Sequence, residues 1–313
     1  METELYKIRG LAKCVKAAYD LFSTNLTTIL RRTWLPVTVF VIIFSVGRML
    51  YISQSASLAS ATWVTNDHWQ WILGSILVTL LTIASAIWAY SAAVSLLNGL
   101  SVKRNIPRIF RFALLVIAIG FVVGLIMGGI TVLPSVTKDH AASSQSPMLY
   151  SAISILLLVL LLILAVPAYY SSLKYLIEPQ QKIGSVLGKP YRKGWHYWGF
   201  LFTTALLTSI IVGVLSLVIM APNYLILSAR IADFQGMSMG DASGLPSYFK
   251  FLALIASMIS TFIYVYLMIW ALMVYYYAYG TLEAKLSARA ENATMQYGQS
   301  EEGTAALPED FGN

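Results

Sequence analysis

Residues 166–200, VPAYYSSLKYLIEPQQKIGSVLGKPYRKGWHYWGF, contain the junction around which the rest of the chain is arranged. An apolar stretch ends inside this segment, a basic hinge follows, and an aromatic-rich segment leads into the next apolar stretch. Versions of the same junction occur earlier and later in the chain. The pattern predicts a membrane protein built from three helical hairpins, with its junctions on one side of the membrane.

The composition is that of a membrane protein. Of the 313 residues, 58% are hydrophobic and only 11% are charged, whereas a soluble domain carries about 25% charged residues. The single cysteine, Cys14, excludes an intramolecular disulfide framework. The N-terminal region lacks the short apolar core and small-residue cleavage site of a secretory signal. We therefore expect an all-α integral membrane protein.

Six segments are long enough to span a bilayer, which requires about 20 mainly apolar residues. The even-numbered segments are longer than the bilayer needs, and the last should project into the cytoplasm. The predicted spans are approximately 33–52, 71–98, 110–134, 148–178, 198–228 and 249–285.

The positive charges alternate between the two sides of these spans. Lysines and arginines are frequent before the first span, between the second and third, around the fourth–fifth junction and after the sixth. Because positive residues favour the cytoplasmic side, both termini should be cytoplasmic. We expect the inner membrane of a bacterium, and the net charge of +7 needs no nucleic acid to explain it. The opposite side carries only Arg48, Lys138, Arg230 and Lys250.

The two ends of the chain lie outside the predicted spans. Within residues 1–32, apolar residues recur every three or four positions, which predicts an amphipathic helix with a break near residues 23–25. This helix would lie in the membrane interface, pack against the protein's own cytoplasmic ends, or do both. Residues 290–313 are polar and acidic and have no apolar period, which predicts a disordered tail.

The ends of the even-numbered spans can be aligned with one another. The segments are AYSAAVSLLNGL from Ala89, AYYSSLKYLIEP from Ala168 and VYYYAYGTLEAK from Val274. Tyrosine, a small residue and leucine recur at matching places, and each segment closes on a polar residue, which is Asn98, Glu178 or Glu283. Three parallel internal repeats would explain this, as would convergence on general membrane features.

The starts of the odd-numbered spans also match, since YDLFSTNLTTIL from Tyr19 aligns with YRKGWHYWGFLF from Tyr191. With this pattern, residues 1–289 resemble a group of bacterial six-helix membrane proteins. The group includes the membrane domain attached to some glycerophosphodiester phosphodiesterases and uncharacterised stand-alone relatives. The resemblance implies six helices. It does not imply phosphodiesterase activity, because the sequence has no segment for the soluble barrel, and it carries over no functional residue.

The candidate site is a charged cluster at the fourth–fifth junction, formed by Lys174, Glu178, Arg192 and Lys193. Lys174 and Glu178 are four residues apart and share a helix face. A glutamate at a helix C-terminus opposes the helix dipole, so Glu178 should also pair with Arg192 or Lys193. The cluster would be a charged gate or a docking site for a partner, or simply an interfacial ion pair, which we prefer.

Gly120, Gly124 and Gly128 form consecutive GxxxG steps, which predict a smooth face where another helix approaches closely. We prefer a partner helix within the bundle to a second copy of the chain. Two Asp–His doublets, at residues 67–68 and 139–140, lack the spacing of a metal motif. We therefore predict no metal site and no cofactor.

These features favour a non-enzymatic subunit or scaffold of a membrane complex, contacting lipid and a protein partner in the membrane or at its cytoplasmic face. The alternative is a permease or lipid-handling transporter that lacks proton-relay carboxylates, because no Asp, Glu, Lys or His lies in the middle of a span. An enzyme is the least favoured class, since the sequence has no HExxH, GxSxG or P-loop motif.

Overall fold

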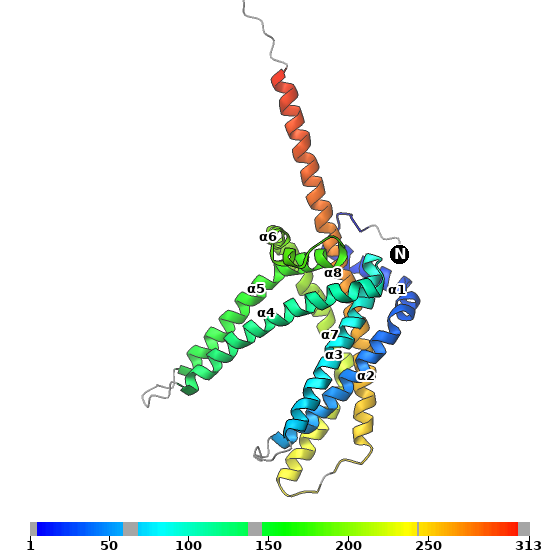
Figure 1. The fold of residues 1–313 in the computed structure, drawn as a ribbon, viewed down its shortest axis with the longest axis vertical. Helices are drawn as coiled ribbons and strands as arrows, with labels where there is room; N and C mark the ends of the chain where they lie inside the picture. The colour runs from blue at the N-terminus through cyan, green and yellow to red at the C-terminus, as the bar shows by residue number, and fades with distance from the viewer. Residues whose placement is uncertain (1–4, 59–67, 137–145, 243, 306–313) are drawn as a thin grey trace, which may run out of the picture.

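The computed structural model describes residues 5–58, 68–136, 146–242 and 244–305 (Figure 1). Within these ranges the chain forms α-helices and one short 3-10 helix, and it contains no β-strand. In chain order the elements are α1 (Leu11–Thr24), α2 (Leu26–Leu58), α3 (His68–Asn98), α4 (Val102–Val136), α5 (Ser146–Ile177), η1 (Ile183–Leu187), α6 (Lys189–His196), α7 (Trp198–Ser238) and α8 (Phe249–Ala305).

Six of these helices are long and apolar enough to cross a membrane, which confirms the prediction of an all-α protein with six spans. The chain is therefore a multipass membrane protein. The candidate spans are Leu26–Leu50, Ile72–Asn98, Val102–Gly129, Ser151–Ile177, Trp198–Ser238 and Phe249–Asn292.

Several helices extend beyond their predicted bounds. The third span was expected to start at residue 110, but α4 begins at Val102 and includes Lys103, Arg104 and Arg108. The prediction stopped at these charges, although lysine and arginine are good helix formers. The fifth span was expected to end near residue 228, and α7 continues to Ser238.

The N-terminal region is divided at Asn25. Its backbone N–H and its side-chain amide both donate to the carbonyl of Leu21, and α2 begins at the next residue. The predicted break near residues 23–25 is therefore confirmed, and residues 26–32 of the predicted segment belong to α2. The helix α1 buries Cys14, Ala18 and Leu21 and packs against α8.

The residues before α1 lie directly on α8. The hydroxyl of Thr281 is 3.3 Å from the carbonyl oxygen of Lys7 and 3.6 Å from the sulfur of Cys14. A Cβ atom at Gly280 would collide with the carbonyl oxygen of Leu5. A glycine at residue 280 therefore allows the N-terminal segment to approach the helix backbone.

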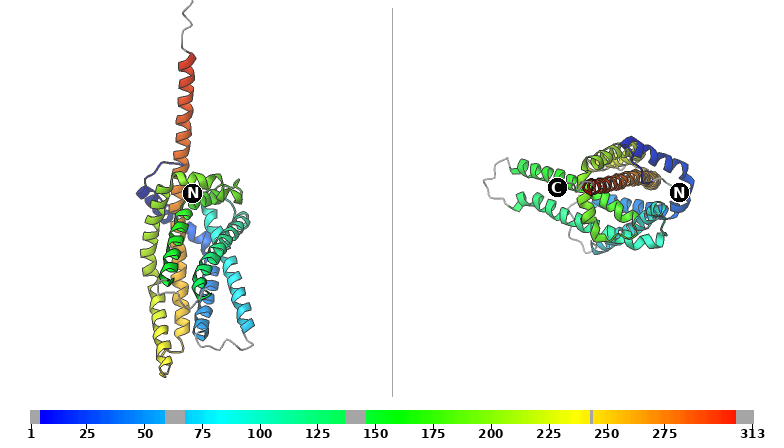
Figure 2. Two further views of the ribbon diagram at one scale, coloured as in Figure 1. Left: turned by 90° about the vertical axis from the view of Figure 1, so that its left-hand side faces the viewer. Right: turned by 90° about the horizontal axis from the view of Figure 1, so that it is seen from above.

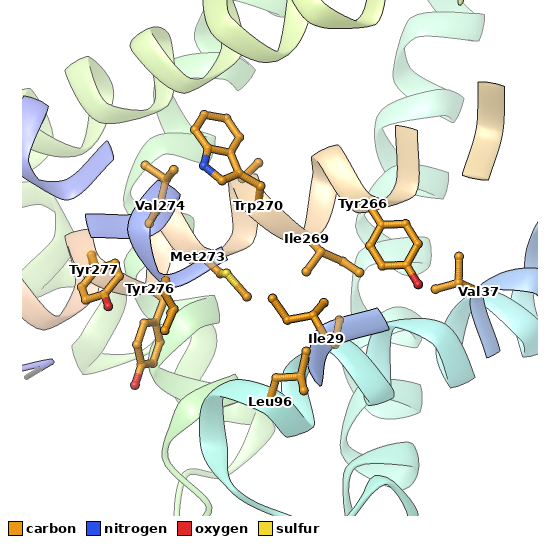
Figure 3. Close-up of a cluster of buried hydrophobic side chains, with 14 of the residues drawn as sticks. Ile29, Val37, Leu96, Tyr266, Ile269, Trp270, Met273, Val274, Tyr276 and Tyr277 are labelled. Atoms are coloured by element: carbon orange, nitrogen blue, oxygen red, sulfur yellow. The ribbon is translucent and has the colours of Figure 1, made fainter. Parts of the chain in front are cut away.

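The main core lies where α8 meets α2 and α3. Figure 3 shows Ile269 and Met273 of α8 pointing toward Ile29 of α2 and Leu96 of α3. Close by, the hydroxyls of Tyr266 and of Thr33 in α2 lie 3.1 Å apart and satisfy each other inside the bundle. This core is at the end of the molecule where α3 ends and α1 lies (Figure 1).

Figures 1 and 2 show that α4 and α5 run together away from the other four long helices. Only 6% of the most apolar 18-residue stretch of α4 is buried, against 28% of the corresponding stretch of α8. The basic segments and the described N-terminal residues lie at one end of the molecule, which we call the basic end. The other end, where α2 and α7 end and α3 and α8 begin, is the loop end.

The helix α8 leaves the bundle at the basic end and projects far beyond it (Figures 1 and 2). The sequence predicted a disordered tail from residue 290, whereas α8 remains helical to Ala305. Residues 290–305 contain no proline and include alanine, glutamate, glutamine and methionine, which are good helix formers. The rest of the predicted tail, residues 306–313, lies outside the described residues.

Candidate functional site

The junction at the basic end begins with a proline inside α5. Pro167 has no N–H, so the carbonyl of Ile163 loses its helical donor. The indole N–H of Trp198, at the start of α7, donates to this carbonyl at 3.2 Å. The hydroxyl of Tyr191 in α6 donates to the neighbouring carbonyl of Leu164 at 2.9 Å. Two aromatic residues of the hinge therefore bind the backbone next to Pro167.

A close backbone contact fixes the position of α6 on α5. A Cβ atom at Gly194 would lie 2.8 Å from the carbonyl oxygen of Pro167 and 3.1 Å from its Cα atom. Both Gly194 and the preceding proline of α6, Pro190, are buried. Only a glycine allows the two helices to approach this closely.

The C-terminal end of α5 is capped by residues from the neighbouring helices. Arg108 of α4 donates to the carbonyls of Tyr175 and Glu178, the latter at 2.8 Å. Asn98, the last residue of α3, donates to the carbonyl of Leu176 at 3.1 Å. The last carbonyls of a helix lack helical donors and carry negative partial charge, so a guanidinium there satisfies and stabilises them. The ends of α3, α4 and α5 are thereby joined.

A polar cluster then joins α5 to α8. Lys174 forms ion pairs with Glu178 at 3.3 Å and with Glu283 of α8 at 2.6 Å. The hydroxyl of Tyr170 donates to Glu283 at 2.6 Å, and that of Tyr279 donates to Glu178 at 2.6 Å. Each helix therefore supplies a tyrosine donor to the carboxylate of the other. We call these five residues the α5–α8 cluster.

The surroundings of Glu178 favour its ionised form. Burial opposes ionisation, but the hydrogen bonds from Tyr279 and Gln181, together with the charge of Lys174, outweigh it and hold the pKa of Glu178 below its usual value. Both carboxylates accept hydrogen bonds and face a shared lysine. This arrangement can hold two helix ends in a fixed register, and its geometry is that of a lock between helices.

The structure brings together two of the four residues of the predicted charged cluster. Lys174 and Glu178 lie together, but Arg192 and Lys193 are exposed on α6, and neither forms an ion pair with Glu178 among the described residues. The reason is that the carboxylate of Glu178 already accepts hydrogen bonds from Tyr279 and Gln181 and pairs with Lys174. Arg192 and Lys193 add positive charge to the surface of the basic end.

Sequence reasoning missed Glu283, Tyr170 and Tyr279 as members of the cluster. One signal was present, because Glu178 and Glu283 close the aligned ends of the fourth and sixth spans. The rings of Tyr169 and Tyr275, which also align, stack with their centroids 5.2 Å apart. Common origin of the three segments stays a prediction.

The three glycines of α4 do not lie against another helix of the described bundle, which was the interpretation that we preferred. A Cβ atom added at Gly120, Gly124 or Gly128 would meet no atom of the described chain within 4 Å. The expected close approach of another helix of the same bundle is therefore not seen over the described residues. The physical reason is that α4 runs along α5 on the outside of the bundle (Figure 1).

A second candidate site lies near the loop end, between α2, α7 and α8. It is a pocket of about 40 Å³, and its polar lining comes from Ser45 and Arg48 of α2, Asn223 and Arg230 of α7, and Ser257 of α8. The sequence placed Arg48 and Arg230 on the same side of the membrane. It did not show that they share a pocket.

Among the described residues, no group of three His, Cys, Asp or Glu side chains could hold a metal ion. Asp67, Asp139 and His140 of the two Asp–His doublets lie outside the described residues. Comparison of the chain with protein-family models, with curated proteins and with solved structures found no match.

Proposed function

We propose that this multipass membrane protein is a non-enzymatic subunit or scaffold of a membrane complex. In this proposal it crosses the inner membrane of a bacterium as three hairpins with both termini in the cytoplasm. The distribution of lysine and arginine supports this orientation, because the segments at the basic end carry most of them. The basic end would then be the surface that cytoplasmic proteins meet.

The observation that carries the proposal is the length of α8. Its 57 residues correspond to about 85 Å at ~1.5 Å per residue, nearly three times a bilayer core of about 30 Å. Helix tilt and the membrane interface account for only part of that length, so the rest of the helix must extend well into the aqueous phase. Figures 1 and 2 show this extension leaving the bundle at the basic end.

The end of α8, residues 290–305, has the character of a docking element, and we call it the α8 extension. Asn292 and Met295 are exposed, and most residues of the sequence ENATMQYGQSEEGTA are polar. A lone polar helix gains no stability from burial, and one way in which such a helix is stabilised is by bridging to another domain. We propose that a soluble cytoplasmic protein packs on the α8 extension.

The α5–α8 cluster gives the α8 extension a fixed base. Lys174 and Tyr170 hold Glu283, seven residues before the extension begins. The ring of Tyr197 lies 5.2 Å from the guanidinium carbon of Arg289, and Arg289 also contacts His196 at 2.7 Å. A partner bound to the α8 extension would therefore be held at a defined orientation to the membrane bundle.

The experiment is purification of the full chain from membranes in a mild detergent at its native level, followed by identification of co-purifying molecules. A variant ending at residue 289 lacks the α8 extension, and a variant ending at residue 305 keeps it. We expect a stoichiometric protein with the full chain and with the longer variant, and its loss from the shorter one. A full chain that co-purifies with no protein would contradict the proposal.

A lipid-handling protein is the second candidate, and the pocket with Arg48 and Arg230 favours it. Cationic side chains inside a membrane protein often mark a path or a site for an anion. The same purification separates the two candidates. A tightly held lipid without any protein partner would favour lipid handling, and a partner lost with the α8 extension would favour the scaffold.

A further inference from the structure

The pocket near the loop end brings together two cations from different helices. Arg48 of α2 and Arg230 of α7 both line it. Neither forms an ion pair with any described residue, because the ion pairs among the described residues are those of Lys174 with Glu178 and Glu283. Arg230 also lies over the ring of Phe249, with its guanidinium carbon 5.9 Å from the ring centroid. Two cationic residues that line one small pocket repel each other, and an anion bound between them would remove that repulsion.

Buried hydroxyl groups in the same pocket point independently to a ligand. The hydroxyl oxygens of Ser45 and Ser257 are buried and have no hydrogen-bond partner among the described residues, although both residues line the pocket. Ser45 is 1% exposed and Ser257 is 7% exposed. Buried polar groups in folded proteins nearly always have a partner. These two hydroxyls can donate to an oxygen atom placed in the pocket.

Asn223 adds a third polar group from α7. Asn223 is 6% exposed. Within the described structure its side-chain amide donates only to the sulfur of Met220, at 3.6 Å, and thioether sulfur is a weak acceptor. Arg230 follows seven residues later, two turns along the same helix face. Two arginines, two serines and one amide therefore surround the pocket with donors from three helices.

The size and depth of the pocket suit a small oxyanion at a membrane surface. Its volume of about 40 Å³ is roughly three times what one water molecule needs. Arg48 lies near the outer end of the predicted span 33–52, at the depth where lipid headgroups meet the apolar core. Apolar residues complete the lining, including Leu227 and Leu254.

We propose that this pocket binds a phosphate group, with Arg48 and Arg230 neutralising its charge and Ser45, Ser257 and Asn223 donating to its oxygens. Arginine is well suited to this role because its planar donors match the geometry of phosphate oxygens. The phosphate belongs either to the headgroup of a membrane lipid or to a soluble phosphate ester. The site is separate from the α8 extension and goes beyond the scaffold function.

The test measures the melting temperature of the full chain, purified in a detergent without phosphate, as ligands are added. The probes are a short-chain phosphatidylglycerol, diacylglycerol with the same chains, and glycerol 3-phosphate. We expect the phospholipid to raise the melting temperature and diacylglycerol to have no effect. An equal rise with glycerol 3-phosphate would identify a soluble phosphate ester as the source, and no rise would identify the lipid headgroup.

The variants assign the effect to this pocket. In the Arg48→Gln/Arg230→Gln double variant, the half-saturating concentration should rise at least tenfold, whereas Lys250→Gln, which removes an exposed cation at the same end, should leave it unchanged. The Ser45→Ala/Ser257→Ala variant should keep the fold and bind the phosphate probe several-fold more weakly. Equal stabilisation by diacylglycerol, or unchanged binding in the serine variant, would overturn the proposal even if the arginine variant fails to fold.

Discussion

The indole N–H of Trp198 donates a 3.2 Å hydrogen bond to the carbonyl oxygen of Ile163, 35 residues earlier in the chain. Pro167 leaves that carbonyl without its helical donor, so the hydrogen bond from Trp198 joins the proline region of α5 to the start of α7. In an isolated helix a proline only weakens the helix. Here it leaves a carbonyl oxygen that accepts a hydrogen bond from the start of α7. This relationship explains why residues 166–200 form a fixed junction between helices.

Replacing Trp198 by Phe should weaken this junction. Phenylalanine keeps the stacking on Phe202, whose ring centroid lies 4.8 Å away, but it lacks the N–H donor. The carbonyl of Ile163 would then be unsatisfied at a cost of about 1 kcal/mol. Thermal unfolding in detergent should show a melting temperature lower by about 2–4 °C.

Trp195→Phe is the matched control for that substitution. Trp195 is 41% exposed, and its indole N–H has no acceptor among the described residues. Its replacement should leave the melting temperature within a degree or so. Equal losses in the two variants would contradict the role given to the indole of Trp198.

Gly194→Ala should separate α6 from α5. The new methyl group would lie 2.8 Å from the carbonyl oxygen of Pro167, and backbone atoms on both sides must move to relieve the clash. We expect a loss of about 1–3 kcal/mol, measured as reduced thermal stability and faster proteolysis between α5 and α7. Gly199→Ala is the control, because a Cβ there meets no described atom within 4 Å and alanine favours the helix. A Gly194→Ala variant as stable as Gly199→Ala would exclude a close contact at this point.

Arg108→Gln should release the end of α5. The guanidinium of Arg108 donates to the carbonyls of Tyr175 and Glu178, and hydrogen bonds to a charged group contribute about 1.5–3 kcal/mol each. We expect a clear fall in melting temperature, whereas Arg104→Gln, at an exposed position of the same helix, should have little effect. If both substitutions are neutral, α5 is not capped by Arg108.

Stability should fall in acid because of Glu178. Its pKa in the folded protein lies below the usual value, so its contribution is complete above the pKa of the unfolded chain, about 4.3. That contribution disappears as the pH falls through the lower folded pKa, because protonation breaks the contacts with Lys174 and Tyr279. The melting temperature measured from pH 7 to pH 3 should therefore drop more steeply for the native chain than for Glu178→Gln. Parallel curves would contradict this.

The sequence predicted the helices well and their contacts poorly. The six spans follow from local hydrophobicity, and each predicted span lies within one long helix to within a residue. Helix ends were less well predicted, as at Val102, because a charged residue stops an apolar pattern without stopping a helix. The helical character of residues 290–305 was missed, since a polar segment gives no period to detect.

The candidate site depended on partners far apart in the chain. Lys174 and Glu178 were found because four residues bring them to one helix face. The bond from Lys174 to Glu283 joins residues 109 positions apart, and no local pattern specifies it. The same holds for Arg48 and Arg230, whose shared pocket depends on how α2, α7 and α8 pack. The glycines of α4 show the converse, because their spacing allows close packing without requiring it.

The proposed function depends most directly on the junction of residues 166–200 facing the cytoplasm. Single cysteines can test this in a Cys14→Ser background, with Lys182→Cys beside η1 and Gly244→Cys in the α7–α8 connection. Both positions are exposed. The measurement is labelling of intact cells with a membrane-impermeant maleimide. The proposal predicts that the Gly244→Cys variant is labelled directly and that the Lys182→Cys variant is labelled only after permeabilisation, whereas labelling of Lys182→Cys in intact cells would contradict it.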